Sequence, residues 1–311
     1  MAGIVGLGTT YNLPNYVGEV FQITPSDTPF LSAIGGLTGG KSTKSTEFSW
    51  QTFDLEDASQ PAIVEGASPT GKARVRAEVS NVVQIFQEAV ELSYSKLAAS
   101  QKIDNVAAVG GVNPITDELD WQVEQALKKI ARDIEYSFLR GVYNKPADNT
   151  QPRKTRGILN AITTNVRDAS GAPLSEKLLL DLLQQIWDNG GIREQETATI
   201  FVNSFQKRKI SEIFGYAPED RRVGGVNVQV IETDFGRLNV MLNRYMPPDT
   251  LLVVSLEVCA PVFLEIPGKG FLFQEPLAPT GSSVKYQIYG ECGLEYGWEG
   301  QHGKIINLAT S

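Results

Sequence analysis

One long apolar stripe constrains the fold of this chain most strongly. It begins after Pro114, and its members recur at spacings of three and four residues. They are Leu119, Val123, Ala126, Leu127, Ile130, Ile134 and Phe138. Thr116 is the predicted N-cap, and Gly141 and Pro146 end the pattern. At 1.5 Å per residue, a helix over 116–140 would be a rod of roughly 36 Å. A single apolar face on so long a helix predicts that it lies across a β-sheet.

Composition adds only broad limits. The chain has 311 residues, of which 41% are hydrophobic and 21% charged, enough for one large or two modest domains. No apolar run approaches the roughly 18 residues that span a bilayer, and the N-terminus lacks the pattern of a secretory signal. We therefore expect no membrane association. The net charge of −8 argues against a surface that coats itself with nucleic acid, because such surfaces need clustered Lys and Arg.

The cysteine and histidine counts restrict the available chemistry. Cys259 and Cys292 are too few for a disulfide framework or a zinc site, and we expect both to be buried thiols. His302 is the single histidine, so acid–base chemistry would depend on carboxylates and lysines, whose spacing indicates no catalytic pair. The sequence therefore predicts no enzyme: no catalytic residues, no cofactor and no bound metal.

Two segments before the long helix lack the pattern of an independent fold. Pro14, Pro25, Pro29 and several glycines exclude a long helix or central strand from the first forty residues, and predict an arm lying on another surface. Residues 46–53 and 74–83 have β character on either side of a turn-rich stretch, which predicts a long hairpin. A hairpin with little apolar surface is not stable alone.

Charged side chains are sorted along this hairpin. Its outgoing half is acidic and its return half basic: Glu47, Asp54, Glu56, Asp57 and Glu65, then Lys72, Arg74 and Arg76. One interpretation is a solvated hairpin with cross-strand pairs, each contributing about 0.2–1 kcal/mol. The other is a projecting loop whose charges meet neighbouring chains. The second makes seven residues candidate intersubunit contacts: Glu47, Asp54, Glu56, Asp57, Lys72, Arg74 and Arg76.

Beyond Pro173 the pattern is mixed α and β. Helices are predicted over 175–187, with Ser175 as N-cap, and over 204–214. Strands are predicted over 199–202, 226–231, 238–242 and 250–255, followed by an antiparallel region over 283–289 and 294–298.

Two motifs suggest chemistry that their surroundings do not support. Gly35–Ser42 matches the phosphate-binding P-loop pattern, but β-type sequence follows where the motif requires a helix. We expect a flexible glycine hinge there. Asp234–Gly236 matches the magnesium-binding tripeptide of protein kinases, yet the chain has no His-Arg-Asp catalytic loop. A turn between two strands is the expected structure.

Several short motifs, taken in their order, suggest a family. They are Arg156–Ile162, Phe201–Ile210, Glu232–Gly236, Leu242–Pro247, Gly290–Glu295 and His302–Ile305. Together with the order of arm, hairpin, long helix and mixed body, they resemble the major capsid proteins of tailed bacteriophages over essentially the whole chain. The resemblance implies an α+β capsid fold. Its expected parts are an N-terminal arm (1–40), an extended hairpin loop (41–93), a peripheral domain (94–170) with a spine helix near 116–140, an axial domain (171–255) and return strands of the peripheral domain (256–311).

The resemblance also implies a function and partners. Copies of the chain would form hexamers and pentamers of an icosahedral head, assembled in the host bacterial cytoplasm with scaffold, portal and possible decoration proteins. The head would enclose double-stranded DNA without sequence-specific binding, which suits a net negative charge. Some relatives are cross-linked through a hairpin lysine, but nothing distinguishes Lys41, Lys44 or Lys72, and we expect no cross-link. No scaffolding segment is visible near Met1, so a separate scaffold protein is expected.

Two alternatives remain open at this point. An encapsulin-like bacterial compartment would have the same fold and would need a pocket for cargo peptides. A P-loop nucleotide hydrolase would use Gly35–Ser42, and replacement of Lys41 would then abolish function while assembly persisted.

Overall fold

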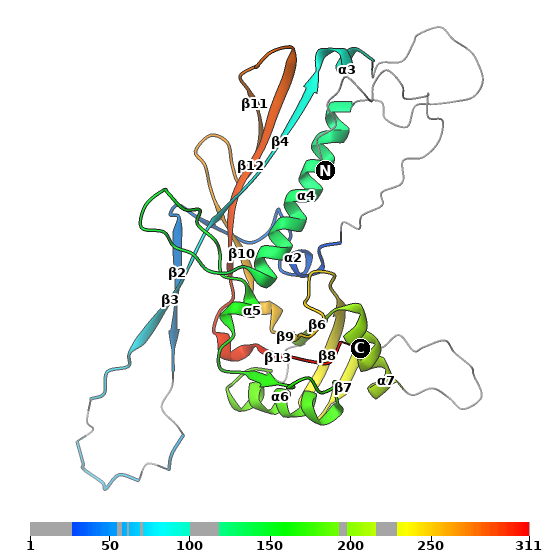
Figure 1. Cartoon of the computed structure of the whole chain (residues 1–311). Coiled ribbons are helices and arrows are strands. Elements are labelled where there is room, and N and C mark those ends of the chain that lie inside the picture. Colours follow the sequence, from blue (N-terminus) through cyan, green and yellow to red (C-terminus); the bar gives the residue numbers. More distant parts are fainter. Residues whose placement is uncertain are drawn as a thin grey trace.

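The computed structural model of the chain describes residues 27–54, 58–60, 62–68, 71–99, 118–192, 198–215 and 229–310. Within these residues the chain forms a five-stranded sheet, a six-stranded sheet and a separate two-stranded ribbon. Figure 1 shows the five-stranded sheet beside the longest helix in the upper part of the molecule. The six-stranded sheet and its helices lie below, and the ribbon projects to the lower left. The fold is mixed helix and sheet, as the sequence predicts.

Strand β12 (Ser283–Glu295) organises the five-stranded sheet. Along one edge it pairs with β4 (Gln84–Ser93) in antiparallel register. Along the other edge it pairs with β11 (Leu272–Leu277) and then with β10 (Ala260–Leu264). The short strand β1 (Lys41–Thr43) runs parallel to β10. Four strands, β4, β11, β10 and β1, therefore depend directly or indirectly on this one strand.

Helix α4 (Glu118–Arg140) packs against β4 and β12. Its buried stripe includes Ile130, Ile134 and Phe138, each at most 2% exposed. The prediction of a long helix lying across a sheet is confirmed, while its predicted N-cap, Thr116, lies outside the described residues. Three short helices accompany this part of the chain: α2 (Pro29–Ala33), α3 (Tyr94–Ala99) and α5 (Ile158–Ala161).

The six-stranded sheet contains both parallel and antiparallel pairs. In order across the sheet, its strands are β5 (Val166–Asp168), β13 (Gly303–Ile306), β9 (Leu251–Val254), β6 (Ala198–Val202), β8 (Gly236–Leu242) and β7 (Val230–Thr233). Helices α6 (Glu176–Asp188) and α7 (Ser204–Phe214) contribute Leu182, Ile186 and Ile210 to the apolar core on one of its faces.

The central strands of this sheet connect two apolar cores. All five residues of β6 are buried, and successive side chains of a strand point to opposite faces. Ile200 and Val202 pack in the core under α6 and α7. Phe201 points the other way, into the core of α4 and the five-stranded sheet, where its ring meets that of Phe30 at 5.5 Å in an edge-on contact. A sheet covered on both faces needs such continuous apolar runs.

Both predicted helices of this region are confirmed, and each begins at a side-chain cap. The Leu178 amide donates to Ser175 Oγ at 3.3 Å, as predicted for the start of α6. The Gln206 amide donates to Asn203 Oδ1 at 2.9 Å at the start of α7. These bonds satisfy amides that the first turn of a helix leaves without partners.

The strands near the C-terminus differ from the prediction. Residues 294–298 are not a separate strand, because β12 runs on to Glu295 and the short 3-10 helix η2 (Glu299–Gln301) follows. Gly290 and Gly293 lie between the two predicted strands. A Cβ at Gly293 would instead lie 2.6 Å from the Phe48 ring, so the glycine allows close packing within a continuous strand.

Further elements of this region were not predicted. Strands β10 and β11 and the 3-10 helix η1 (Leu256–Val258) were missed. Strand β13 pairs with β5 and β9 in the six-stranded sheet, whereas residues 256–311 were expected to return to the other part of the molecule.

A buried carboxylate joins three parts of the fold. Glu135 on α4 is fully buried and accepts the amides of Phe30 at 2.9 Å and Leu31 at 2.6 Å, at the first turn of α2. It also accepts Asn243 Nδ2 at 2.5 Å from the segment after β8. Burial raises the pKa of Glu135 above its ordinary value, and the three hydrogen bonds oppose that rise by favouring the ionised form.

We expect Glu135→Gln to lower the free energy of unfolding by about 1–3 kcal/mol, the cost of leaving a buried polar group unpaired. An amide has one acceptor oxygen, so its NH2 group would face the Leu31 amide, donor against donor. Urea denaturation monitored by circular dichroism measures the change. Glu124→Gln, at an exposed position of the same helix, is the control and should change stability by less than about 0.5 kcal/mol. Equal stability of the Glu135→Gln and unchanged proteins would contradict the role assigned to Glu135.

Candidate intersubunit surface

The two-stranded ribbon carries the predicted contact residues. Strands β2 (Glu47–Phe53) and β3 (Arg76–Val82) pair in antiparallel register from Glu47 opposite Val82 to Phe53 opposite Arg76. The predicted pairing of 46–53 with 74–83 is confirmed. Strand β4, which was included in the 41–93 hairpin segment, pairs with β12 instead. Figure 1 shows the ribbon extending away from both sheets.

Aromatic side chains fix the root of the hairpin, which we define as residues 47–50 and 79–82. Trp50 Nε1 donates to Gly297 O at 2.7 Å, and its ring meets Tyr296 edge-on at 5.0 Å. Phe48 stacks on Trp50 with ring centroids 6.0 Å apart. The ribbon is therefore attached to the segment that follows β12.

Asn81 adds a buried polar attachment at the root. It is fully buried, and its Nδ2 donates to Leu294 O at 2.7 Å and to Arg156 O at 3.2 Å. Its Oδ1 accepts the amides of Arg156 and Val82, both at 2.9 Å. One amide side chain thus holds the ribbon against β12 and against the chain that leads into α5.

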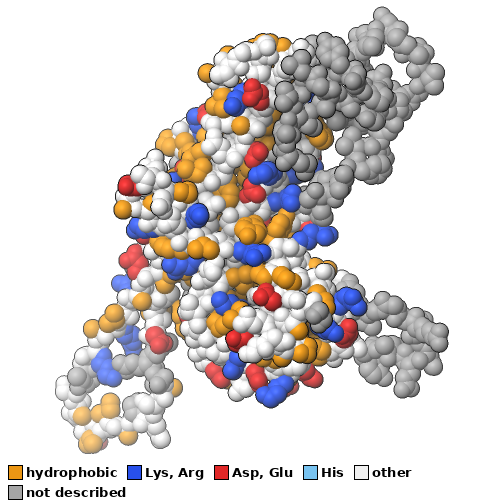
Figure 2. Space-filling model, in the orientation of Figure 1, with side chains coloured by type: hydrophobic (Ala, Val, Ile, Leu, Met, Phe, Trp, Pro, Cys, Tyr) orange, Lys and Arg blue, Asp and Glu red, His pale blue; other side chains and the backbone are white. Residues whose placement is uncertain are grey.

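The outer end of the hairpin, its described residues from 53 to 76, exposes large apolar side chains. Phe53 is 67%, Ile63 71%, Val64 82% and Val75 84% exposed. Figure 2 shows hydrophobic side chains on this projecting lobe at the lower left. A hairpin with little apolar surface was predicted, so these exposed residues were missed. Ile63 and Val64, adjacent apolar residues between turn signals, were the available indication.

Glu47 and Arg76, among the seven predicted contact residues, have partners within the chain. Glu47 pairs with Lys145 at 2.6 Å, from the loop after α4, and this hydrogen bond lowers the pKa of the Glu47 carboxyl. Arg76 Nη1 donates to Gln51 Oε1 at 2.9 Å across the ribbon. Glu47 therefore belongs to the root and contacts the body of its own chain.

The remaining predicted contacts do not form one cluster with Glu47. Asp54, Lys72 and Arg74 are exposed at the outer end. Glu56 and Asp57 lie outside the described residues. The charges accordingly lie among the exposed apolar side chains of the outer end, a mixture found at protein interfaces.

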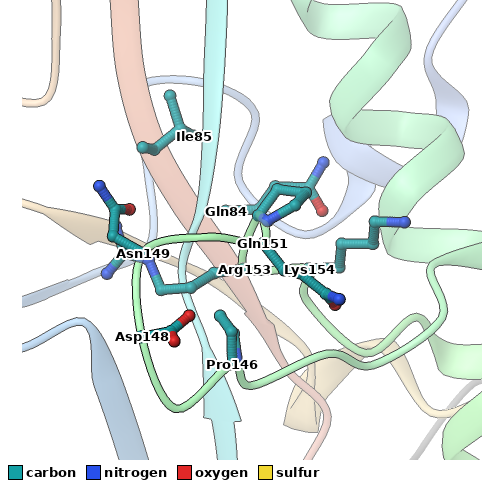
Figure 3. A pocket seen from close by; sticks show the side chains of 9 residues that line it. Gln84, Ile85, Pro146, Asp148, Asn149, Gln151, Arg153 and Lys154 are labelled. Atoms are coloured by element: carbon teal, nitrogen blue, oxygen red, sulfur yellow. The ribbon is translucent and has the colours of Figure 1, made fainter.

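A second surface feature lies beside the hairpin root. Figure 3 shows a pocket of about 400 Å³ between the start of β4 and the loop that follows α4, with Ile85, Pro146 and Asp148 among its lining residues. Arg153, also in the lining, pairs through Nη2 with Glu291 at 2.9 Å. The Tyr289 hydroxyl donates to the other Glu291 oxygen at 2.6 Å. Burial raises the pKa of Tyr289 to about 12.

The Gly35–Ser42 segment is not a phosphate-binding loop. Lys41 lies in strand β1 and pairs with Glu295 at 2.7 Å, and strand β2, not a helix, follows. Nor is the segment an open hinge: Gly40 has φ +100°, and a Cβ there would lie 2.3 Å from Pro261 O. The kinase-like tripeptide Asp234–Gly236 forms the β7–β8 turn, as predicted.

Two further kinds of site are absent from the described residues. No group of three or more His, Cys, Asp or Glu side chains in the described part of the chain comes together as metal ligands. Among the helices that the structure describes, none is long and apolar enough to cross a membrane.

Solved structures with the same fold define the class of protein. The capsid subunit of cyanophage A-1(L) aligns with a TM-score of 0.69 at 11% identity, covering 99% of this chain and 100% of that one. The capsid of a native GTA particle aligns at 0.62 and 12% identity, with 98% of each chain covered. The SrpI encapsulin of Synechococcus elongatus aligns at 0.59 and 10% identity, covering 96% and 93%. The chain thus has the fold of capsid and encapsulin shell subunits.

The family model of SU10 major capsid proteins matches residues 3–309, so the chain belongs to the SU10 major capsid protein family. No curated protein sequence matches it. The predicted resemblance to phage major capsid proteins and the predicted capsid fold are confirmed. The chain is a structural protein of a phage capsid, and this family assignment implies a non-enzymatic role.

We expect Asn81→Leu to lower the free energy of unfolding by about 3 kcal/mol, because it leaves buried amides and carbonyls without partners. Hydrogen exchange should accelerate first in 47–53 and 76–82, since the root loses its attachment. Asn149→Leu, at an exposed position of the pocket loop, is the matched control and should leave both measurements unchanged. Unaltered exchange in the Asn81→Leu ribbon would show that the aromatic contacts hold the root without Asn81.

Proposed function

We propose that copies of this chain form the hexamers and pentamers of an icosahedral head, with the outer end of each hairpin packed on a neighbouring copy. The observation that carries the proposal is the exposure of Phe53, Ile63, Val64 and Val75 at the outer end of the hairpin, where none of the four belongs to either apolar core. Fully burying a Val or Ile side chain is worth about 1.5–3 kcal/mol. Contact with a second copy would bury these side chains and gain that free energy, whereas in an isolated chain they stay exposed to water.

The seven charged hairpin residues add specificity to this contact in our proposal. Asp54, Lys72 and Arg74 lie beside the exposed apolar side chains, where charges steer association and select register. Glu47 contributes less, because it lies at the root and pairs there with Lys145 of its own chain. Arg76 donates to Gln51 across the ribbon. Glu56 and Asp57, predicted contacts outside the described residues, are included in the proposed contact.

The proposed division of the chain follows its expected parts. Residues 1–40 are the arm, 41–93 the hairpin loop, 94–170 the peripheral domain with α4 as spine helix, 171–255 the axial domain, and 256–311 the return strands. We adjust this division where the pairing differs: β13 (Gly303–Ile306) and β5 (Val166–Asp168) belong with the axial strands, because β13 pairs with both β9 and β5.

The proposed head encloses double-stranded DNA without binding it tightly or sequence-specifically. The net charge of −8 supports this, since a basic lining would bind phosphates tightly and in a salt-dependent manner. Assembly in the host bacterial cytoplasm, with scaffold and portal proteins and with decoration proteins on the finished virion, completes the proposal. The encapsulin-like compartment is the lesser alternative, because the family model matched is that of a phage capsid protein; co-purification of a cargo enzyme in place of DNA would favour it.

Replacement of the exposed apolar side chains tests the hairpin contact. We expect Ile63→Ser combined with Val64→Ser to abolish shells in electron micrographs while circular dichroism and thermal unfolding of the free chain stay unchanged, because both side chains lie outside the cores. The control is Val142→Ser, at a position 68% exposed outside the hairpin, which should leave shells intact. Normal shells from the double variant would refute the proposed contact.

Charge reversal tests the steering role of the outer end. We expect Arg74→Glu to slow assembly about tenfold in low salt, measured by light scattering, because electrostatic complementarity raises association rates. The difference from the unchanged chain should shrink near 0.5 M salt, where charges are screened within a few ångströms. Lys177→Glu, an 85% exposed position on α6, is the matched control. Equal rates for the unchanged chain and Arg74→Glu in low salt would exclude a role for this charge.

A further inference from the structure

The single histidine of the chain lies at the crossing between the two sheets. His302 is fully buried between the end of β12 at Glu295 and the start of β13 at Gly303. Tyr296 belongs to the core of α4 and the five-stranded sheet, and Ile305 to the core under α6 and α7. We call residues 296–303 the crossover. Buried polar side chains within it act on both parts of the molecule.

Both ring nitrogens of His302 are hydrogen-bonded, and their partners select one tautomer. The Ser255 amide, directly after β9, lies 3.2 Å from Nδ1 and can only donate. Nδ1 is therefore the acceptor, and Nε2 carries the hydrogen that it donates to Tyr296 O at 2.7 Å. The neutral ring thus closes a bridge from β9 to the crossover.

The crossover also holds the hairpin root. Gly297 O accepts Trp50 Nε1 at 2.7 Å, directly after the residue that accepts from His302. Asn165 Nδ2 donates to Gly300 O at 2.7 Å and to His302 O at 2.9 Å, which attaches the rest of the crossover to the segment before β5. A displacement at His302 is consequently transmitted to Trp50 through one or two residues of backbone.

Protonation is incompatible with this arrangement. A second ring proton would be placed on Nδ1, where it faces the Ser255 amide, donor against donor. Burial lowers the pKa of His302 to about 4, while the hydrogen bond to Tyr296 O and the charge of Glu299 oppose the shift. The unfolded ring titrates near 6.5. The neutral folded form is therefore favoured at pH 7, and its advantage falls as pH drops from 6.5 towards 4.

The groups around the ring offer little compensation for a positive charge. Glu299 on η2 is engaged by Thr163 and Thr164, whose amides donate to its Oε2 at 2.7 and 3.1 Å. Lys304 on β13 donates to Leu159 O at 2.8 Å, and Cys259 Sγ lies 3.5 Å from Ser255 O. On the far side of Tyr296, Arg156 donates to the phenol oxygen at 3.2 Å. The buried Ser255 hydroxyl has no hydrogen-bond partner among the described residues.

We propose that protonation of His302 is an acid-operated release: it breaks the bridge from Ser255 to the crossover and frees the hairpin root at Trp50. The device goes beyond shell formation and does not depend on it. Through this release, the orientation of the projecting hairpin responds to the protonation of His302 and not to the surface charges of the hairpin itself.

Hydrogen exchange on the full-length chain tests the release. Exchange is measured by mass spectrometry from pH 7 to pH 4 and corrected for the pH dependence of the chemical rate. We expect exchange in 47–53 and 296–303 to rise by about tenfold or more as His302 protonates, while α6 stays protected. His302→Gln supplies a donor and an acceptor without a titrating ring and should abolish the step. Asp188→Asn, which removes an exposed carboxylate on α6, should retain it.

Three results would overturn the proposal. One is the same acid step in His302→Gln, which would assign it to carboxylates, and another is the absence of a step in the unchanged chain. Should His302→Gln fail to fold, histidine labelled in the ring gives a single imidazole NMR signal, because the chain has one histidine. Its titration should coincide with the exchange step, and a separation of more than about one pH unit would be the third contrary result.

Discussion

The arrangement of this molecule depends on one buried carboxylate. Glu135 on α4 accepts hydrogen bonds from the first turn of α2 and from Asn243, which follows β8. The residues leading into β1, the long helix and the six-stranded sheet are therefore held in one position relative to one another. A carboxyl group in an apolar core is costly unless it is hydrogen-bonded, so the site tolerates few rearrangements of its partners. Precise coupling of this kind suits a subunit that has to repeat the same shape many times.

The hairpin, unlike the buried junction at Glu135, is held at one end only. Its root is packed by Trp50 and Asn81 against the segment after β12 and the chain leading into α5, whereas its outer end leaves Val64 and Val75 more than 80% exposed. An isolated two-stranded ribbon is at best marginally stable in water. In our proposal, a ribbon fixed at one end and apolar at the other is half of a contact that a second copy completes, which agrees with membership of a capsid protein family.

Regular periodicity made part of this structure predictable. Helices α4, α6 and α7 were expected almost within their observed bounds, because an apolar stripe of period 3.6 and a capping residue are local signals. The prediction was wrong at 294–298, where Gly293 in β12 serves close packing against Phe48, which is distant in sequence. The sequence predicted the hairpin of the candidate site and its exposed charges. It did not predict the pairing of Glu47 with Lys145, because nearly a hundred residues separate the two.

The sequence by itself determined the helices, the hairpin, the absence of a P-loop setting around Gly35–Ser42 and the resemblance to phage capsid proteins. Each depends on neighbours in the chain or on the order of motifs. Only the tertiary structure decided that Glu135 is a buried junction, that β13 joins the six-stranded sheet and that His302 lies at the crossover. Those assignments arise from burial and from hydrogen bonds between residues that folding brings together, such as Glu135 and Leu31 over 104 positions. A local pattern carries no record of such partners, because the same Glu or His would occupy a solvated surface equally well.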